Sequence, residues 1–422
     1  MTQHPSLHPN FPATVVRLDS GLTIIHHEVP ATPVVVADVW VRAGAIAEPA
    51  AWSGLAHFLE HMIFKGTDQL APGHFDYAIE SRGGMTNAAT SHDYAHFFLT
   101  IAADALAETL PYLADLLLHA AIPADEFECE RHVVLEEILQ AMDDPDWIGY
   151  QAMAEQVYQQ HPYGRPILGT AELLNQRSPE EMMCFHKAHY QPENMTVVIV
   201  GGVDLDTTLA LVTHAFRPFA QPVVCPHDES IAAPSIQGIQ RQVLELPRIE
   251  QGRLTLAWIC PGIDQLKAGY GIDLLSALLA EGRSSRLVRE LREDQQLVMD
   301  IGSSFSLQRD CSLFSISAWL DPKAAPEVEA RIQSHVAAIA NEPITEAELK
   351  RAKRLLCNDY AFSTETSGQL AGLYGYYGTV ASPELCFTYP QVIQSYDTES
   401  LQQLAKRYVS PENYVATVLK PI

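Results

Sequence analysis

The sequence predicts an α+β protein made of two homologous domains, each a mainly antiparallel sheet covered by helices. Its 422 residues are long for one hydrophobic core and suit two domains of about 200 residues each. In both halves, extended β-branched segments alternate with segments of helical composition. Short motifs of the first half also recur in the second at a nearly constant offset, which indicates a duplicated unit.

Two pairs of similar segments indicate the duplication. The tripeptide Pro-Glu-Asn stands between an aromatic residue and an apolar run at Pro192 and again at Pro411, an offset of 411 − 192 = 219. The helical segment that begins at Ile122 is similar to the one that begins at Ile344, an offset of 344 − 122 = 222. Chance similarity of short strings is the alternative, but two echoes at nearly one offset favour duplication.

A Pro- and Ser-bearing stretch, FAQPVVCPHDESIAAPSIQG, separates the two halves. It has no hydrophobic period and is typical of a linker. We therefore expect a first domain at residues 1–220, a linker at 221–238 and a second, homologous domain at 239–422.

Several segments of the first half predict local structure. Residues 34–44 are β-branched and apolar and predict a buried strand, and the alternation across residues 94–102 predicts another. Residues 126–142 have a strongly helical composition. The segment SGLAHFLEHMIFKGT predicts a helix with Ser53 as its N-cap.

Charge and hydropathy exclude some classes of function. With 52 acidic and 27 basic residues, the formal net charge of −25 repels phosphate backbones, so we expect no nucleic-acid partner. The acidic surface favours basic peptides, although solubility accounts for it equally well. No run of 18 or more apolar residues predicts a membrane span. The first residues lack the features of a secretory signal or a transit peptide, so the expected location is the cytoplasm.

The seven cysteines are dispersed and form no CxxC pair. Such a set predicts buried free thiols in a reducing compartment rather than a disulfide framework or a cysteine-based zinc site.

The segment His57-Phe58-Leu59-Glu60-His61 predicts a metal site. His57 and His61 are four residues apart, so their imidazoles lie on one face of a helix and can reach one ion. Glu60 lies on nearly the same face, where it can hold a water molecule without being a ligand. The two histidines have apolar neighbours, so they are poorly explained as solvated surface side chains. The alternative to a metal site is a pair of core histidines whose hydrogen bonds are satisfied.

A zinc site that performs hydrolysis needs three protein ligands and one open position for water. The helical segment ERHVVLEEILQAM offers Glu130, Glu136 and Glu137 as the third ligand. Glu130 and Glu137 are seven residues apart and face the same side of the helix, whereas Glu136 points away from it.

These motifs resemble the pitrilysin/insulinase family of inverted-motif (HxxEH) zinc peptidases, and most closely its short-chain branch, which includes the mitochondrial processing peptidase subunits. The resemblance covers nearly the whole chain and rests on GLAHFLEHMIFKGT, GGMTNAATSHDYAHF, ERHVVLEEI, HPYGRPILGT, PENMTVVIVG and GRSSRLVRELRE. It implies a LuxS/processing-peptidase-like metallohydrolase fold. It also implies one zinc ion per chain, because the second half has no histidine at the matching helix.

The resemblance also implies the roles of the site residues. His57, His61 and Glu137 match the zinc ligands of the family, and Glu137 is preferred to its neighbour because it aligns with the ERxVxxxE string. Glu60 matches the general base that activates the zinc-bound water, and Glu130 matches a supporting carboxylate of the catalytic site.

The match to the family is incomplete where substrate is bound. Asn87 and Ala88 match the edge strand that holds the substrate backbone by β-addition, and a turn residue is the alternative for Asn87. Arg292 matches the arginine of the family's R-E-x-x-x-L-x-Y pattern, but Met299 stands in place of the tyrosine. A thioether cannot donate a hydrogen bond to an oxyanion. The resemblance therefore implies a heterodimer with a homologous chain that carries the Arg/Tyr pair, with a homodimer as the alternative.

The predicted function is that of a zinc metalloendopeptidase that hydrolyses peptides or unfolded segments. One alternative is a non-catalytic interaction or core subunit of a larger complex, although such chains usually lose the metal ligands. Another is a metal-binding protein without peptidase activity.

Overall fold

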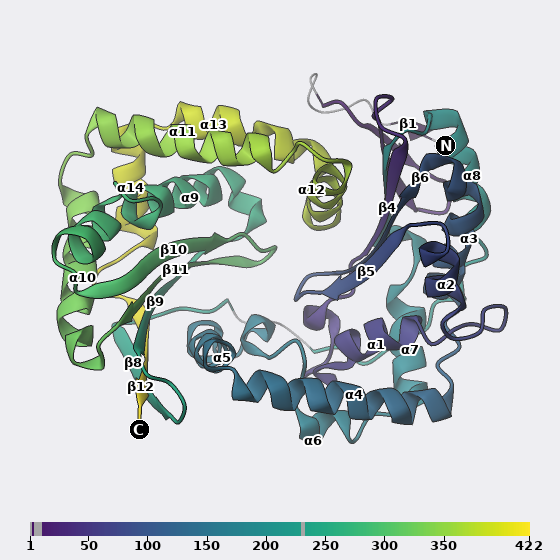
Figure 1. Ribbon diagram of the computed structural model, residues 1–422, viewed down its shortest axis with the longest axis horizontal. Helices are drawn as coiled ribbons and strands as arrows, with labels where there is room; N and C mark the ends of the chain where they lie inside the picture. Colours follow the sequence, from purple (N-terminus) through teal and green to yellow (C-terminus); the bar gives the residue numbers. More distant parts are fainter. Residues whose placement is uncertain (1, 4–10, 229–232) are drawn as a thin grey trace. The chain divides into compact units, whose positions relative to one another are not determined.

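The computed structural model describes residues 2–3, 11–228 and 233–422, which fold into two compact units (Figure 1). Unit 1 comprises the described residues of 1–139, 166–230 and 363–387. Unit 2 comprises those of 140–165, 231–362 and 388–422. Each unit is built around one sheet and is described by itself.

The sheet of unit 1 has the strand order β1-β2-β3-β7-β4-β6-β5. All neighbours are antiparallel except the parallel pair β3 and β7. The strands expected at 34–44 and 94–102 are confirmed as β4 and β6. The strands are β1 (Thr2–Gln3), β2 (Thr14–Arg17), β3 (Thr23–Glu28), β4 (Val34–Val41), β5 (Met85–Thr90), β6 (Ala95–Ala102) and β7 (Met195–Gly201).

Helices cover both faces of this sheet, so its central strands are buried on both sides. One face of β4 and β6 packs into a core with α1 and α3, and α12 packs on the other face of β4 and β7 (Figure 1). The α-helices of unit 1 are α1 (Leu55–Ile63), α2 (His74–Glu80), α3 (Leu106–His119), most of α4 (Ala124–Asp143), α6 (Ala171–Leu174), α7 (Pro179–His189), α8 (Leu205–Ala215) and α12 (Ser367–Val380). Its 3₁₀ helices are η1 (Ala45–Ala47), η2 (Ala50–Trp52), η3 (Ala103–Ala105), η5 (Pro192–Asn194) and most of η9 (Pro383–Thr388). The last residue of η9, Thr388, belongs to unit 2.

The sheet of unit 2 has the strand order β10-β11-β9-β12-β8, with β12 and β8 as its one parallel pair. Its strands are β8 (Ile239–Leu246), β9 (Gly252–Pro261), β10 (Val298–Ser306), β11 (Cys311–Leu320) and β12 (Tyr414–Pro421). Its α-helices are α5 (Pro145–Tyr158), α9 (Leu266–Ala280), α10 (Ala325–Asn341), α11 (Glu346–Phe362), α13 (Tyr389–Ser395) and α14 (Thr398–Tyr408). The shorter helices are η4 (Pro162–Gly164), η6 (Ile263–Gln265), η8 (Pro322–Ala324) and the π-helical turn η7 (Val288–Asp294).

The two sheets repeat one topology, which confirms the predicted α+β architecture of two domains. The order β3-β7-β4-β6-β5 in unit 1 corresponds to β8-β12-β9-β11-β10 in unit 2, and the parallel pair lies at the same place in each. The first residues of β12 and β7 stand at an offset of 414 − 195 = 219. Those of α14 and α7 stand at the same offset, 398 − 179 = 219. The offset read from the sequence is therefore also the offset of the folded elements.

Each half of the chain contributes one helix to the unit of the other half. α5 and α12 are equivalent helices of 14 residues each. Their first residues stand at an offset of 367 − 145 = 222. α12 packs on β4 and β7 of unit 1, where the side chain of any larger residue at Gly375 would overlap Trp40, and α5 packs on β12 and β9 of unit 2. The linear division at 220 and 238 therefore differs from the compact units at these two helices. Local patterns predict a helix, but they do not predict which sheet it covers.

The prediction that all cysteines are free thiols is wrong for one pair. Cys184 on α7 and Cys225 in the expected linker form a disulfide, with Cα atoms 6.1 Å apart. Of the other five, Cys260, Cys311 and Cys386 are buried, Cys357 is intermediate and Cys129 is exposed. Disulfides are typical of oxidising compartments, so the argument from free thiols for a reducing compartment no longer holds.

The first part of the expected linker is held on unit 1. Residues 221–228 have no regular secondary structure, but the disulfide at Cys225 and a hydrogen bond from the Ala50 backbone N–H to the carboxylate of Asp228 (3.0 Å) fix them. Residues 229–232 of this prediction lie outside the described part of the chain. Within the described residues, no helix combines the length and the apolar character that crossing a membrane requires.

Candidate metal centre

The helix that carries the HxxEH motif is α1, and seven of its nine residues are buried. Its N-cap is Gly54 in the left-handed conformation (φ 95°), so the prediction of Ser53 as N-cap is wrong. The carboxylate of the buried Glu48 instead accepts hydrogen bonds from the backbone N–H groups of Gly54 and Ala56. An acidic side chain at this end satisfies free N–H donors and complements the helix dipole, which fixes the start of α1.

His57, His61 and Glu137 form a group that could hold a metal ion, and it is the one such group found in the described part of the chain. The Nε2 atoms of His57 and His61 lie 3.7 and 3.6 Å from the same oxygen, Oε2 of Glu137 on α4. Ligand atoms placed about 2.0–2.1 Å from a tetrahedral zinc ion lie roughly 3.3 Å from one another. The spacing is therefore close to that of three ligands around one ion.

The burial of one ligand atom, Oε2 of Glu137, supports the same fit. Oε2 of Glu137 is shielded from solvent and has no hydrogen-bond partner among the described residues. A buried carboxylate oxygen without a donor is costly unless a cation compensates it. The donor set of two imidazoles and one carboxylate is also the one found at catalytic zinc sites, with a fourth position open.

The protonation state of His57 favours the binding of a cation. Burial, together with the neighbouring His61, lowers the pKa of His57 to about 4, so the imidazole of His57 is neutral at pH 7. A neutral imidazole offers a nitrogen lone pair without first losing a proton, which favours metal binding at neutral pH.

Glu130 orients His61 through Nδ1, the ring nitrogen that does not face Glu137. Its Oε1 lies 2.9 Å from Nδ1 of His61, and its Oε2 lies 2.5 Å from the ammonium of Lys65. Burial raises the pKa of Glu130, but the hydrogen bonds from Lys65 and His61 outweigh burial, and the pKa is lowered. Because an ionised carboxylate only accepts hydrogen bonds, the proton of His61 lies on Nδ1. Its Nε2 is left free to face Glu137.

Glu60 lies beside the group without belonging to it. Its side chain is half-buried, and its Oε2 accepts a 2.5 Å hydrogen bond from the hydroxyl of Thr90 on β5. Burial raises the pKa of Glu60, and the hydrogen bond from Thr90 offsets only part of this effect. The arrangement leaves a carboxylate with raised basicity next to the two imidazoles.

β5, which holds Asn87 and Ala88, is the edge strand of its sheet and pairs only with β6 among the described strands. Asn87 therefore lies in a strand, and its interpretation as a turn residue is wrong. Ala88 is half-buried on the same face as Thr90, whereas Asn87 is exposed on the opposite face and accepts a hydrogen bond from the Ala88 N–H (2.9 Å).

Arg292 lies on η7 of unit 2, so it is not part of the geometry described for the metal group in unit 1. Its guanidinium group is bound to Glu293 (2.9 Å) and Asp300 (2.9 Å). Met299 on β10 has 53% of its surface exposed and donates no hydrogen bond. α9, the equivalent of α1, has no histidine.

Sequence reasoning missed three residues of the site: Lys65, Thr90 and Glu48. Lys65 could have been found from its spacing, since it follows His61 by four residues on the same helical face. Thr90 shares the period-2 alternation of Thr86 and Ala88, but only the packing of β5 against α1 brings it to Glu60. Glu48 precedes the helix by several residues, and no local signal links it to the cap.

Comparison with known proteins gives the family of the chain. Residues 23–171 match the family model "Insulinase (Peptidase family M16)", and residues 177–356 match the model "Peptidase M16 inactive domain". An uncharacterized zinc protease of Mycobacterium leprae (strain TN) is 31% identical over 411 residues, which cover 96% of this chain and 91% of that protein. An uncharacterized zinc protease of Bacillus subtilis (strain 168) is 26% identical, with 82% of this chain and 83% of that protein covered.

Solved structures agree with this result. A protease from Helicobacter pylori has a TM-score of 0.91 and 27% identity, with 97% of this chain and 99% of that chain covered. An M16-like peptidase from Alicyclobacillus acidocaldarius has a TM-score of 0.84 at 22% identity, covers 99% of this chain and 100% of its own, and supports the fold alone. From its motifs, its fold and these relatives, the chain belongs to the insulinase family of peptidases, M16.

Proposed function

We propose that the chain is a zinc-dependent metalloendopeptidase that hydrolyses peptides or unfolded segments. The observation that carries the proposal is the convergence of two imidazole nitrogens on one buried, unpartnered carboxylate oxygen of Glu137. Membership of a peptidase family supports it. The intact ligand set disfavours a non-catalytic subunit.

His57, His61 and Glu137 would hold the metal, and Glu130 would orient His61 through Nδ1. When bound, zinc supplies a Lewis acid that polarises a peptide carbonyl and makes a water molecule more acidic. The hydrogen bond to Glu130 holds the ring of His61 in the orientation that ligation needs.

Glu60 is the proposed general base. Its carboxylate takes a proton from the attacking water and afterwards returns this proton to the nitrogen of the leaving amine. The raised pKa of Glu60 favours both proton transfers, because a group that acts first as a base and then as an acid is most effective when its pKa lies near the working pH. Thr90 would hold one carboxylate oxygen in place, so the other is directed to the water.

The edge of β5 is the proposed binding site for the substrate backbone. An extended peptide that adds a strand beside Asn87 and Ala88 would gain main-chain hydrogen bonds that do not depend on its side chains. Such binding accepts unfolded segments of varied sequence and rejects folded ones. The net charge of −25 supports a preference for basic peptides.

A partner chain would complete the site. Met299 cannot donate to an oxyanion, and Arg292 is held by Glu293 and Asp300. We therefore favour a heterodimer in which a homologous chain supplies the missing Arg/Tyr pair, with a homodimer as the alternative. Full peptidase activity of the purified chain as a monomer or homodimer would show the heterodimer to be wrong.

The function is tested with an internally quenched, mildly basic peptide and a zinc determination on the same sample. We compare the wild type with Glu60→Gln and with Glu80→Gln, an exposed residue of α2 that serves as the control. We expect zinc in all three proteins and a loss of cleavage of about 10²–10⁴-fold in Glu60→Gln alone. Zinc binding without cleavage, for the chain alone and mixed with a homologous chain, would contradict the proposal.

A further inference from the structure

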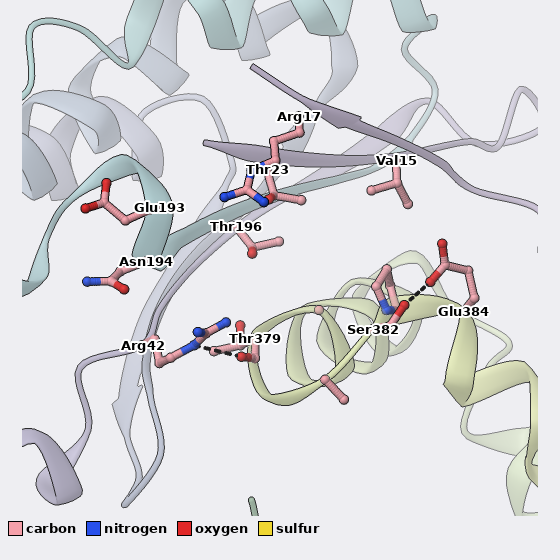
Figure 2. A pocket seen from close by; sticks show the side chains of 13 residues that line it. Val15, Arg17, Thr23, Arg42, Glu193, Asn194, Thr196, Thr379, Ser382 and Glu384 are labelled. Carbon is pink, nitrogen blue, oxygen red and sulfur yellow. Dashed lines mark hydrogen bonds between the residues drawn. The ribbon is translucent and has the colours of Figure 1, made fainter. Parts of the chain in front are cut away.

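A cavity of about 540 Å³ lies in unit 1 (Figure 2). It is lined by residues of β2, β3 and β7, by the residue that follows β4, and by the C-terminal end of α12. In the strand order of the sheet, β2 and β3 lie on the opposite side from β5. Its volume falls within the range of ligand-binding pockets.

Two arginines give the cavity a cationic part. Arg17 on β2 is exposed and lines the cavity, and its guanidinium group makes no ion pair or hydrogen bond with any described residue. Arg42 donates a hydrogen bond from Nε to the carbonyl oxygen of Thr379 (3.0 Å). In Figure 2, Arg17, Thr196 and Arg42 follow one another across the middle of the view. In a chain with 52 acidic and 27 basic residues, two arginines that line one cavity favour an anionic group.

One wall of the cavity is formed by Thr379, near the end of α12. Thr379 lines the cavity and has 2% of its surface exposed, and its Oγ1 makes no hydrogen bond to any described residue. Because this oxygen is shielded from solvent, it does not face the cavity, and Thr379 contributes through its carbonyl oxygen, which positions Arg42.

The end of α12 gives the cavity an anionic part. Ser382 and Glu384 lie to one side of the arginines in Figure 2, and the Ser382 hydroxyl donates a hydrogen bond to the carboxylate of Glu384, which is buried. The C-terminus of a 14-residue helix also carries a partial negative charge, which favours a cation there. Because Glu193 also lines the cavity, two arginines and two glutamates lie around it.

We propose that this cavity binds a short peptide or amino acid with both termini free. The terminal carboxylate would be bound by Arg17 and Arg42, and the ammonium by Glu384 at the end of α12. A ligand with only negative charge would meet two carboxylates, and one with only positive charge would meet two guanidinium groups, whereas a zwitterion complements both. Binding of this ligand does not depend on the metal group. A peptidase releases peptides with both termini free, so the identification of this ligand as a product of the chain's own reaction rests on the proposed function.

The test is a titration of the full chain with tri-alanine, measured by isothermal titration calorimetry. N-acetyl-tri-alanine lacks the ammonium, and tri-alanine amide lacks the carboxylate. We expect saturable binding of tri-alanine at one site per chain. The affinity of each blocked form is expected to be lower than that of tri-alanine by about tenfold or more, because each loses a charge-assisted contact. Equal binding of either blocked form, or no saturable binding of tri-alanine, would overturn the proposal.

Variants separate this cavity from the metal group. Arg17→Gln and Glu384→Gln are each expected to weaken tri-alanine binding about tenfold or more, whereas Arg289→Gln, on an exposed arginine of unit 2, leaves it unchanged. Thermal midpoints check that each variant is folded. Cleavage of the longer quenched peptide is measured in parallel.

Loss of tri-alanine binding in Arg17→Gln and Glu384→Gln, with cleavage retained, supports the cavity as the binding site. Loss of tri-alanine binding in His57→Ala, with binding unchanged in Arg17→Gln, would assign the ligand to the metal group and overturn the proposal. Absence of cleavage in all proteins bears on the proposed function alone.

Discussion

The hydroxyl of Thr90, at the end of β5, donates a 2.5 Å hydrogen bond to the carboxylate of Glu60 on α1. The bond joins the edge strand proposed to hold the substrate to the residue proposed to move the proton. Two effects act on this carboxylate: burial raises its pKa, and the Thr90 hydrogen bond opposes this by stabilising the ionised form. The position of β5 therefore influences the acidity of Glu60.

Replacing Thr90 with valine removes this hydrogen bond and keeps the shape of the side chain. The pKa of Glu60 then rises further, because the effect that lowers it is lost and burial remains. Since the base must be ionised to accept a proton, the acid limb of the pH dependence of kcat/KM moves to higher pH. Cleavage at pH 6 falls more than cleavage at pH 8.

Thr86→Val is the matched control for this prediction. Thr86 lies on the same face of β5, but its hydroxyl donates to the carbonyl oxygen of Phe98 (2.9 Å). The control therefore keeps the wild-type pH profile. An acid limb that stays in place or moves to lower pH in Thr90→Val would mean that the hydrogen bond does not control Glu60.

Glu130→Gln tests the support of the metal group. Glutamine keeps an acceptor for His61 but loses the charge that binds Lys65 and polarises the imidazole. We expect zinc affinity to fall about 10–100-fold, as for other residues that orient a metal ligand, measured by competition with a chelator. The fold is retained, because Gln replaces Glu with the same shape.

Glu136→Gln is the control on the same helix. Glu136 is exposed and lies outside the group of His57, His61 and Glu137. Its replacement leaves zinc affinity unchanged, whereas Glu137→Gln weakens it most, because an anionic carboxylate ligand becomes a neutral and weaker amide ligand. Equal zinc affinity in the Glu136 and Glu137 variants would show that the third ligand is a different residue.

The sequence predicted those parts of the site that depend on local spacing. His57 and His61 are one helical turn apart, so their proximity follows from the helix alone. The proximity of Glu137 followed only from the resemblance to a family, because Glu137 is far from the second histidine along the chain, at an offset of 137 − 61 = 76. The contacts of Thr90 and Glu48 depend on how a strand and a loop pack on α1, and no periodicity reports such packing.

The fold shows the same division between local and tertiary information. Strand and helix positions, and the repeat itself, could be predicted from hydrophobic period and offset. The exchange of α5 and α12 between the units and the pairing of Cys184 with Cys225 could not, because both depend on the path of the whole chain. A segment without a period predicts a linker, but not that a disulfide fixes it.

The disulfide between Cys184 and Cys225 predicts the number of cysteines that react with a thiol reagent and a loss of thermal stability when the bond is removed. Under denaturing, non-reducing conditions, 7 − 2 = 5 cysteines react with a thiol reagent. The bond closes a loop across a sequence separation of 41 residues, for which chain entropy predicts a stabilisation of about 4 kcal/mol. The double variant Cys184→Ser, Cys225→Ser therefore has a lower thermal midpoint, whereas Cys129→Ser does not. Seven reactive thiols in protein purified without reductant would contradict this prediction.

In the second half, three interacting carboxyl groups lie on α9, directly after α9 and on α11. Asp359 on α11 and Glu137 on α4 stand at an offset of 359 − 137 = 222, which is also the offset of the equivalent helices, and α9 takes the place of α1. Burial, together with the charge of Asp359, raises the pKa of Asp273 on α9 to about 6, although a hydrogen bond from Tyr389 opposes the rise. Burial and the neighbouring Asp273 raise the pKa of Glu281 to about 7.

These raised pKa values predict that the carboxyl groups make unit 2 less stable at pH 8 than at pH 4. A carboxyl group whose pKa is higher in the folded than in the unfolded chain stabilises the fold fully below the unfolded pKa. The stabilisation is lost as the pH rises through the folded pKa. For Asp273 this window runs from near pH 4 to pH 6, and the loss is on the order of 2–3 kcal/mol. Asp273→Asn keeps an acceptor for Tyr389 and removes the charge, so it raises the thermal midpoint at pH 8 and has little effect at pH 4. Asp264→Asn, at an exposed position just before α9, leaves the midpoint unchanged at both pH values. A lower midpoint of Asp273→Asn at pH 8 would mean that the ionised carboxylate stabilises this unit, contrary to the effect of its burial.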